Sequence, residues 1–307
     1  MKGICFFFRV ANQLENEKRT VMTNTQENAR WGELLHSAVH TPGKLLAAYT
    51  AFHNYSFGNA LLALEQCISR GIEPGPLNSY RGWLGLNRQV RKGEKGLCLC
   101  MPLTYKKSTK DKVADANEED GEEQKEVRRR FVYRNYWFVL SQTEGDTPYG
   151  QSIPVFELDG ALQSLGISRI AFDETNGNVQ GFARQREIAI NPIAELPLKT
   201  TFHEIAHIVM GHTTSQSLVD SEYMDCNIRE VEAESVALIC CESLGLPGAE
   251  AARGYIQHWL QDDKEIPNRS AARIFTAAQT ILKAGNSKED SALCCGDSSS
   301  VARAEMY

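Results

Sequence analysis

The stretch TFHEIAH at residues 201–207 contains the pattern HExxH, and it decides how this chain is interpreted. Residues four apart share one helix face, so His203 and His207 can present two ring nitrogens to a single metal ion. Glu204 projects beside them, where it could deprotonate a water on that metal. Apolar residues flank the motif and predict a buried helix, in which histidines need partners. A pair of hydrogen-bonded core histidines without a metal is the alternative.

A third histidine ligand of the HExxHxxGxxH type is excluded, because Met210 and Thr213 stand where that pattern needs Gly and His. Carboxylates follow instead in the stretch REVEAES at residues 229–235. Its outer acids, Glu230 and Glu234, are four residues apart and share a helix face, whereas Glu232 is rotated away from them.

One acid of that pair can bind the metal while the other accepts the second N–H of a ligand histidine. A His/His/Glu site keeps one coordination position open for water, as catalytic zinc sites do. We therefore expect Zn²⁺ as the cofactor, although this ligand set also accepts other divalent ions. The alternative for the acids is a solvated helix face, which the apolar run at residues 236–239 disfavours.

The composition is that of a water-soluble globular chain, with 42% hydrophobic and 23% charged residues among 307. Its early apolar run, at residues 4–8, is far shorter than the roughly 20 residues that span a bilayer. We expect no membrane partner. None of the nine cysteines is spaced as CxxC, which indicates reduced thiols in a cytoplasmic protein.

Charge is distributed unevenly along the chain. Residues 151–307 carry 12 basic against 22 acidic residues, whereas residues 78–110 carry eight basic residues and one acid, Glu94. A basic stretch interleaved with aromatic residues is typical of single-stranded nucleic-acid binding, in which bases stack on exposed rings. The candidate contacts are Arg81, Trp83, Arg88, Arg91, Lys92 and Lys95. The alternative is a solvated charged surface with Trp83 packed in the core beneath it.

Hydrophobic periodicity predicts an α+β protein of two domains. Helices are expected near residues 31–39, 45–52 and 59–69, then a strand at 97–103 paired with 131–140 across a charged insertion at 106–130. A helix at 156–165, extended runs at 169–173 and 181–191, and helices at 203–211, 230–244 and 271–284 follow. We expect domains at 22–150 and 151–285, a loose arm or mis-called start at 1–21, and a disordered tail at 286–307.

The motif HEIAH followed by a helix of ExxAE type resembles the zincin-like peptidases. That resemblance implies Glu230 as the third ligand and Glu234 as the neighbour that accepts from a ligand histidine. More of the chain is similar to ArdC-type antirestriction proteins. The matching segments are YSFGNALL at 55–62, GW at 82–83, RKGEKG at 91–96 and SQTE at 141–144. The ArdC resemblance implies an N-terminal domain that binds single-stranded DNA, with Tyr55 and Asn59 beside the basic stretch, and a metallopeptidase-like domain after it.

These features together predict a DNA-binding zinc metallopeptidase of a plasmid, phage or other mobile element, acting on an unknown protein or peptide. Two alternatives remain. The chain could be a DNA-protecting antirestriction module whose zinc domain is structural, or a regulatory peptidase that cleaves a repressor. An intact Glu204 disfavours a purely structural site, which needs no general base. Tyr223, His212 and Tyr255 are equal candidates for stabilising the oxyanion.

Overall fold

The structure is a computed structural model that describes residues 31–106, 127–145, 152–176, 178–213, 226–260 and 265–286. It divides into two compact units. One contains the described residues from 95 to 137, and the other contains residues 30–94 together with those from 138 onward. The predicted tail at 286–307, apart from Asn286, and the arm at 1–21 lie outside the described residues.

Three helices open the second unit, as predicted: α2 (Trp31–His40), α3 (Lys44–Phe52) and α4 (Phe57–Arg70). Each buries one apolar stripe. Gly71 ends α4 in the left-handed region, with φ 63°, and its backbone N–H donates to the Ile68 carbonyl. A residue without a Cβ adopts this conformation at little cost, which explains why the helix stops at this position.

An antiparallel ribbon forms most of the first unit. Strand β3 (Leu97–Lys106) pairs with β4 (Val127–Val139), and the register joins Leu99 to Arg134 and runs without interruption to Lys106 and Val127. A bulge shifts the register between Leu97 and Leu99. The predicted pairing across the insertion is confirmed. The strands reach further than predicted, into both ends of the segment 106–130, and residues 107–126 of that segment lie outside the described part.

Short elements flank the ribbon in sequence, three before β3 and two after β4. They are β1 (Leu77–Ser79), α5 (Tyr80–Gly85), β2 (Gln89–Val90), the 3₁₀ turn Leu140–Gln142 and β5 (Thr143–Glu144). Strands β2 and β5 pair antiparallel through Val90 and Thr143. The sequence periodicity does not predict these elements, because two to six residues are too few to show a period.

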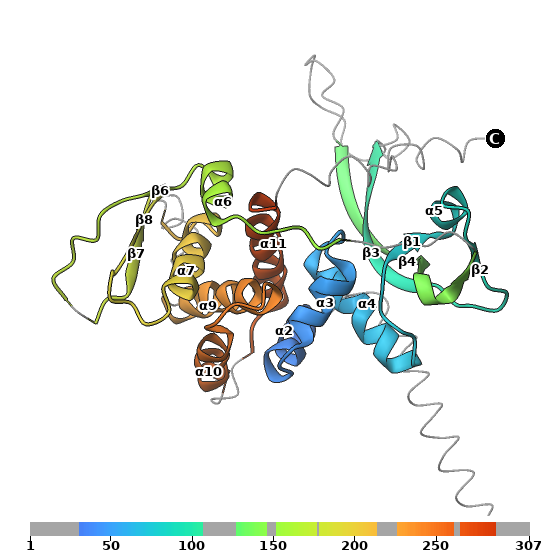
Figure 1. Cartoon of the computed structure of the whole chain (residues 1–307), viewed down its shortest axis with the longest axis horizontal. Helices are drawn as coiled ribbons and strands as arrows, with labels where there is room; N and C mark the ends of the chain where they lie inside the picture. The colour runs from blue at the N-terminus through green and yellow to red at the C-terminus, as the bar shows by residue number, and fades with distance from the viewer. Residues whose placement is uncertain are drawn as a thin grey trace, which may run out of the picture. The chain divides into compact units, whose positions relative to one another are not determined.

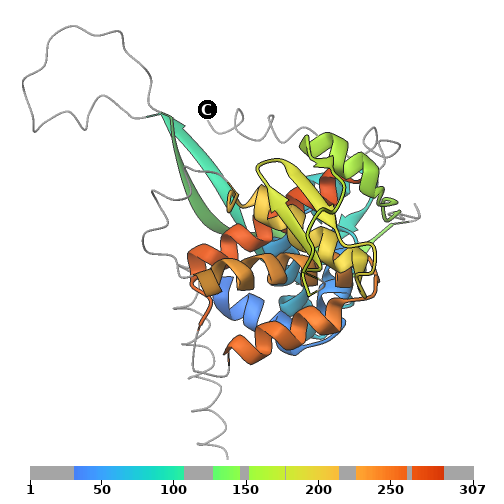
Figure 2. The same ribbon diagram turned by 90° about the vertical axis from the view of Figure 1, so that its left-hand side faces the viewer.

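A small mixed sheet follows α6 (Leu158–Leu165). Its strand order is β6 (Ser168–Arg169), β8 (Glu187–Ile190), β7 (Gly181–Arg184), with β6 parallel and β7 antiparallel to β8. The single extended run predicted at residues 181–191 is wrong, since this stretch is a hairpin with Gln185 at φ 52° in its turn. Both β7 and β8 contact α7 (Pro197–Val209), as Figure 2 also shows.

Helix α9 (Cys226–Ser243) forms the centre of the second unit (Figure 1). It packs against α7, α3, α10 (Ala249–Leu260) and α11 (Asn268–Ala284). Every residue from 231 to 243 is buried, which is why this helix shows almost no amphipathic pattern. Helix α10 was not predicted. Gly254 and several alanines dilute its apolar stripe.

Contacts across the sequence explain why α2 and α3 cluster with the C-terminal helices. The Arg253 guanidinium donates to the Ala38 carbonyl at 3.0 Å, and Glu242 Oε1 accepts from the Leu45 backbone N–H at 3.0 Å. The compact units therefore divide the chain differently from the predicted boundary at residue 150. Among the residues that the structure describes, no helix is both long and apolar enough to span a bilayer.

Candidate metal centre

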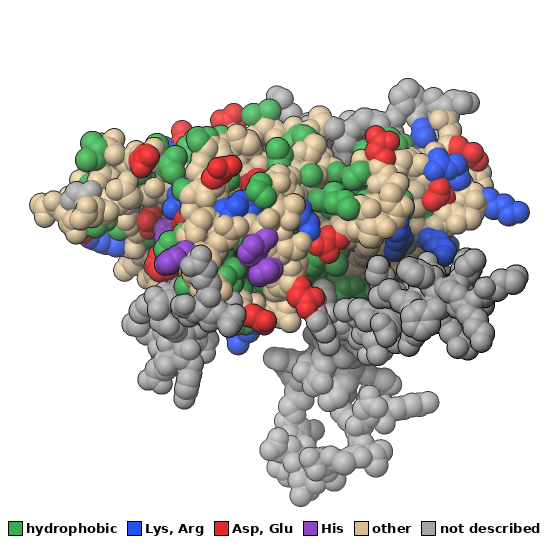
Figure 3. Space-filling view, turned by 90° about the horizontal axis from the view of Figure 1, so that it is seen from below, with side chains coloured by type: hydrophobic (Ala, Val, Ile, Leu, Met, Phe, Trp, Pro, Cys, Tyr) green, Lys and Arg blue, Asp and Glu red, His purple; other side chains and the backbone are tan. Residues whose placement is uncertain are grey.

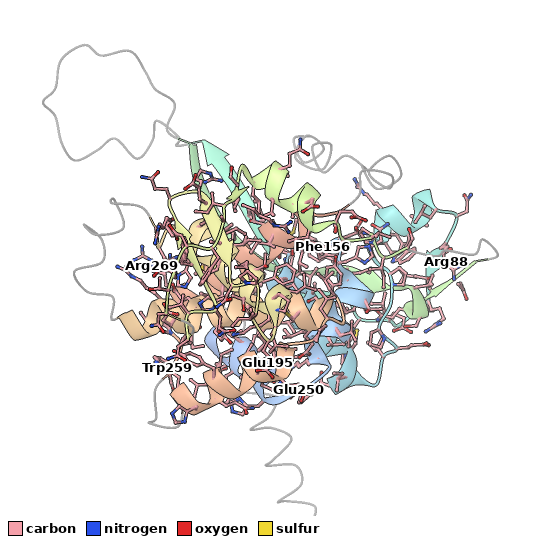
Figure 4. The ribbon with its side chains drawn as sticks, turned by 60° about the vertical axis from the view of Figure 1, so that its left-hand side comes forward. Arg88, Phe156, Glu195, Glu250, Trp259 and Arg269 are labelled. Atoms are coloured by element: carbon pink, nitrogen blue, oxygen red, sulfur yellow. The ribbon has the colours of Figure 1, made fainter. Side chains whose placement is uncertain are left out.

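Helix α7 carries the HExxH motif and begins at Pro197, a residue suited to the first turn because it lacks the N–H that a helix start leaves unpaired. One face of the helix is buried, including Phe202, whose ring packs on that of Phe156 with centroids 5.7 Å apart (Phe156 is labelled in Figure 4). His203 and His207 lie at the edge of this buried face, with side chains 17% and 14% exposed.

The structure brings together the three residues predicted as ligands. The Nε2 atoms of His203 and His207 lie 3.1 Å apart. The Glu230 carboxylate on α9 lies 3.3 Å from His203 Nε2 and 3.6 Å from His207 Nε2. One ligand atom from each residue falls within 4.8 Å of the others, so the group could hold a metal ion. Figure 3 draws one face of the molecule, on which acidic, basic and histidine side chains are exposed among apolar ones.

The donor set fits a divalent cation. Two imidazole nitrogens and a carboxylate oxygen converge at distances that suit a shared positive charge, and this combination binds Zn²⁺ and related ions. The pKa shifts of these residues also indicate that the group favours a positive charge. Burial opposes the charged form of His203, yet hydrogen bonds to Glu230 and Glu234 outweigh it and raise its pKa to about 9. Hydrogen bonds from His203 and His207 lower the pKa of Glu230 well below its usual range.

Glu234 lies behind His203, as expected for the acid that orients a ligand histidine. Its Oε2 atom accepts from His203 Nδ1 at 2.8 Å, and its Oε1 atom lies 2.6 Å from Lys199 Nζ. Burial raises the pKa of this carboxyl, but hydrogen bonds from His203 and Lys199 leave it lowered overall. Lys199 has no counterpart in the sequence prediction. It precedes His203 by four residues, the helical spacing that would have identified it.

Glu204, the predicted general base, is 7% exposed and is not one of the three grouped ligands. Burial raises the pKa of its carboxyl, and the neighbouring His203 and His207 only partly offset that effect. A carboxylate whose proton affinity is raised in this way is suited to accept a proton and return it.

The sequence prediction missed a second pair, His212 and Glu232, which lies on the other side of His207. His212 Nδ1 lies 3.0 Å from His207 Nδ1, and its Nε2 lies 3.0 Å from Glu232 Oε2. Glu232 is fully buried, with Arg273 3.6 Å from its other oxygen. Burial lowers the pKa of His212, and the hydrogen bond to Glu232 only partly opposes this. The position of Glu232 outside the ligand group agrees with its predicted rotation.

The prediction that bases stack on Trp83 is wrong for this conformation. Trp83 is 0% exposed, and its indole N–H donates to the Phe138 carbonyl at 2.8 Å. A ring that is enclosed on both faces cannot receive a base. The exposed aromatic neighbour is Tyr80, which is 44% exposed. Trp83 therefore packs in the core, beneath the charged surface.

The other residues predicted to contact DNA occupy different environments. Arg88 (labelled in Figure 4) donates to Thr143 Oγ1 and the Gly145 carbonyl, both at 3.0 Å. Arg91 pairs with Glu94 at 2.8 Å. The half-buried residues are Tyr55, whose hydroxyl donates to the Leu77 carbonyl at 2.8 Å, and Asn59. Besides Arg91, the exposed residues are Arg81, Lys92 and Lys95.

Comparisons with known proteins assign a family to the N-terminal part of the chain. Residues 12–138 match the model of the N-terminal domain of anti-restriction factor ArdC. A relative named "Uncharacterized protein y4eC" from Sinorhizobium fredii (strain NBRC 101917 / NGR234) is 30% identical over 112 residues, which are 36% of this chain. The matched part spans about one third of that relative, 34% of its length.

Two solved structures are similar over most of the chain. The metal-free structure of the antirestriction ArdC protein from the R388 plasmid is 19% identical, covers 84% of this chain and 96% of its own, and gives a TM-score of 0.50. The Mn(II)-bound structure of the same protein covers 83% and 97%, with 19% identity and a TM-score of 0.47. Residues 12–138 therefore form a domain of the ArdC N-terminal family, and the chain has a fold similar to that of R388 ArdC.

Proposed function

We propose that this chain is a metal-dependent peptidase joined to a domain that binds single-stranded DNA. The observation that carries the first part is the convergence of His203, His207 and Glu230, with the buried Glu204 on the same helix as both histidines. Within the described residues the group offers three ligands. Three protein ligands leave a position for water or substrate, whereas structural zinc sites commonly use four.

Each residue of the site takes a distinct part in peptide hydrolysis. His203, His207 and Glu230 would hold the ion, which when bound polarises the scissile carbonyl and acidifies water. Glu204 accepts a proton from the attacking water at its carboxylate and passes it to the leaving amine nitrogen. Glu234, held by Lys199, keeps the Nδ1–H of His203 occupied, so that Nε2 of that ring points into the site.

Tyr255 is the candidate oxyanion stabiliser that the electrostatics and exposure favour. Burial raises the pKa of its phenol, as do the charges of Glu230 and Glu234, so the hydroxyl lies within electrostatic reach of the site. Its side chain is 46% exposed, which leaves it accessible to substrate. His212 is already engaged by His207 and Glu232, and Tyr223 lies outside the described residues.

Single-stranded DNA binding by the N-terminal region is supported by the family of residues 12–138 and by exposed cations. Arg81, Lys92 and Lys95 are exposed, and Tyr80 offers an accessible ring next to Arg81 in the chain. Basic side chains with accessible rings are the usual means of binding single strands without reading their sequence. Antirestriction, by protection of DNA, is the biological role that follows.

A regulatory peptidase that cleaves a repressor would use the same site and differs only in its substrate. A DNA-binding module with an inactive metal domain is the more distant candidate. The buried Glu204 with a raised carboxyl pKa argues against it, because a purely structural ion needs no proton acceptor.

The test is a pair of variants assayed with Zn²⁺ on fluorescently labelled casein, with and without single-stranded DNA. Glu204→Gln should keep about one equivalent of metal and lose at least about a hundredfold in cleavage rate. Glu195→Gln is the matched control, an exposed acid shortly before α7 (Figure 4), and should cleave like the wild type. Equal cleavage by both variants would contradict the role of Glu204.

A further inference from the structure

We propose that His212 and Glu232 form a positioning relay that fixes the ring of His207 with Nε2 facing the metal group. This inference rests on the proposed metal site. Neither residue is among the three grouped ligands, so the relay acts through His207 and touches no substrate.

The backbone at the end of α7 places His212 beside His207. Gly211 adopts φ 76°, in the left-handed region, and its N–H donates to the Ile208 carbonyl at 3.1 Å. The backbone N–H of His212 then donates to the carbonyl of His207 at 2.8 Å. This pair of bonds is a Schellman cap, which turns the chain back over the last helical turn. His207 and His212 are therefore connected by a backbone hydrogen bond and by a hydrogen bond between their rings.

A second contact holds the same turn. Arg273 on α11 donates to the Met210 carbonyl at 2.9 Å and lies 3.6 Å from Glu232 Oε1. Glu232 comes from α9, and its side chain is fully buried. Three helices thus meet at the cap, and the ring of His212, 4% exposed, has little freedom to rotate.

The direction of each hydrogen bond follows from the carboxylate. A carboxylate only accepts, so His212 Nε2 donates to Glu232. A neutral imidazole that donates from Nε2 accepts at Nδ1, so the proton between the two rings belongs to His207 Nδ1. In the neutral ring that a metal requires, His207 Nε2 is then left with a lone pair, and it lies 3.1 Å from His203 Nε2 and 3.6 Å from Glu230. The buried acid thereby sets the tautomer of a ring that it does not touch.

The two ligand histidines are oriented by different devices. His203 donates directly to Glu234, whereas His207 reaches its carboxylate through one intervening ring. Both arrangements turn Nε2 toward the metal group, which is the common requirement of the site. The ring of His212 can be tested specifically. One replacement can keep both of its hydrogen bonds in the same direction, and another can remove them.

The experiment compares His212→Gln, His212→Leu and the exposed control His258→Gln, each as the full chain, titrated with Zn²⁺ against a fluorescent chelator. Leu cannot hydrogen-bond, so Zn²⁺ affinity should fall by about 10- to 100-fold. An amide can accept from His207 through its oxygen and donate to Glu232 through its nitrogen, so His212→Gln should recover most of that loss. His258→Gln should match the wild type. Wild-type affinity in a folded His212→Leu protein would overturn the proposal.

A second measurement keeps the proposal testable if the variants fail to fold. The ¹⁵N resonances of the wild-type histidine rings report which nitrogen carries the proton. We expect His207 protonated at Nδ1, both in the Zn²⁺-loaded protein and after chelator treatment at pH above about 9. Protonation of His207 at Nε2 in the chelator-treated sample would overturn the relay. A wild type that binds no Zn²⁺ would instead contradict the proposed function, while the tautomer still decides the relay.

Discussion

The metal group on α7 and α9 was predicted from residue spacing, and the basic segment at residues 80–95 was predicted from composition. The structure agrees with the first prediction more closely than with the second. In the first, the spacing of HExxH fixes both histidines on one helix face, and the structure brings them together with Glu230. In the second, composition alone suggested that aromatic and basic residues share a surface, yet Trp83 is enclosed and Arg91 is paired with Glu94. Spacing on a helix specifies a direction for each side chain, whereas composition does not.

The largest expected effect separates core from surface in the basic segment. Trp83→Ala should lower the free energy of unfolding by about 3–5 kcal/mol, because a fully buried indole leaves a cavity and the Phe138 carbonyl loses its donor. Tyr80→Ala, at a 44% exposed position, should stay within about 1 kcal/mol of the wild type in urea unfolding. An equal loss of unfolding free energy in the two variants would contradict the burial of Trp83.

A smaller effect concerns pH at the metal group. The pKa of His203 is raised to about 9, so a proton competes with the metal below that pH. Apparent Zn²⁺ affinity should fall about tenfold for each pH unit below 9, or about a hundredfold at pH 7, and level off above 9. Titration against a chelator of known affinity checks this. An affinity independent of pH from 7 to 9 would contradict the raised pKa.

The same shift gives a sign for the stability of chelator-treated protein. The folded pKa of His203 lies above its unfolded value of about 6.5, so protonation stabilises the fold fully below that value. This stabilisation is lost as pH rises through about 9. Metal-stripped protein should therefore unfold at lower urea concentrations at pH 9 than at pH 6.5, and added Zn²⁺ should remove the difference.

The smallest effect tests the exposed cations. Replacing both Arg81 and Lys92 by Glu should make the slope of log K against log salt for single-stranded DNA shallower by roughly 1.4, if each neutralises one phosphate. The exposed Arg269 on α11 (Figure 4) is the control, and Arg269→Glu should leave the slope unchanged. The same change in both proteins would indicate that DNA does not bind through the basic segment.

The sequence predicted much of the fold where a period had room to repeat. Helices α2, α4 and α7 and the pairing of β3 with β4 were predicted, because each carries an apolar stripe or a run of β-formers. Helix α10 and the two-residue strands were missed, since a diluted stripe or a pair of residues shows no period. The hairpin at 181–191 was merged into one run because its turn contains no glycine.

The metal site was predictable as far as helical spacing reaches. The spacing of four residues predicts the pairs His203/His207 and Glu230/Glu234, and the resemblance to zincin-like peptidases implies that Glu230 is the ligand. The pair His212 and Glu232 could not be predicted in the same way, because a cap at the end of α7 and a buried turn of α9 bring it together. The sequence signal for it was an acid between two apolar residues, Val231 and Ala233, in a predicted helix.

The most direct test of the metal site is a Zn²⁺ titration of Glu230→Gln beside Glu250→Gln. Glu250 is an exposed acid on α10 (Figure 4), which makes it the matched control. Glu230→Gln should reduce affinity by at least about a hundredfold, because a neutral amide replaces the anionic ligand that lies within 3.6 Å of both histidines. Glu250→Gln should bind one equivalent as tightly as the wild type. Full Zn²⁺ affinity in Glu230→Gln would show that the ion uses another third ligand. That result would contradict the site described for α7 and α9.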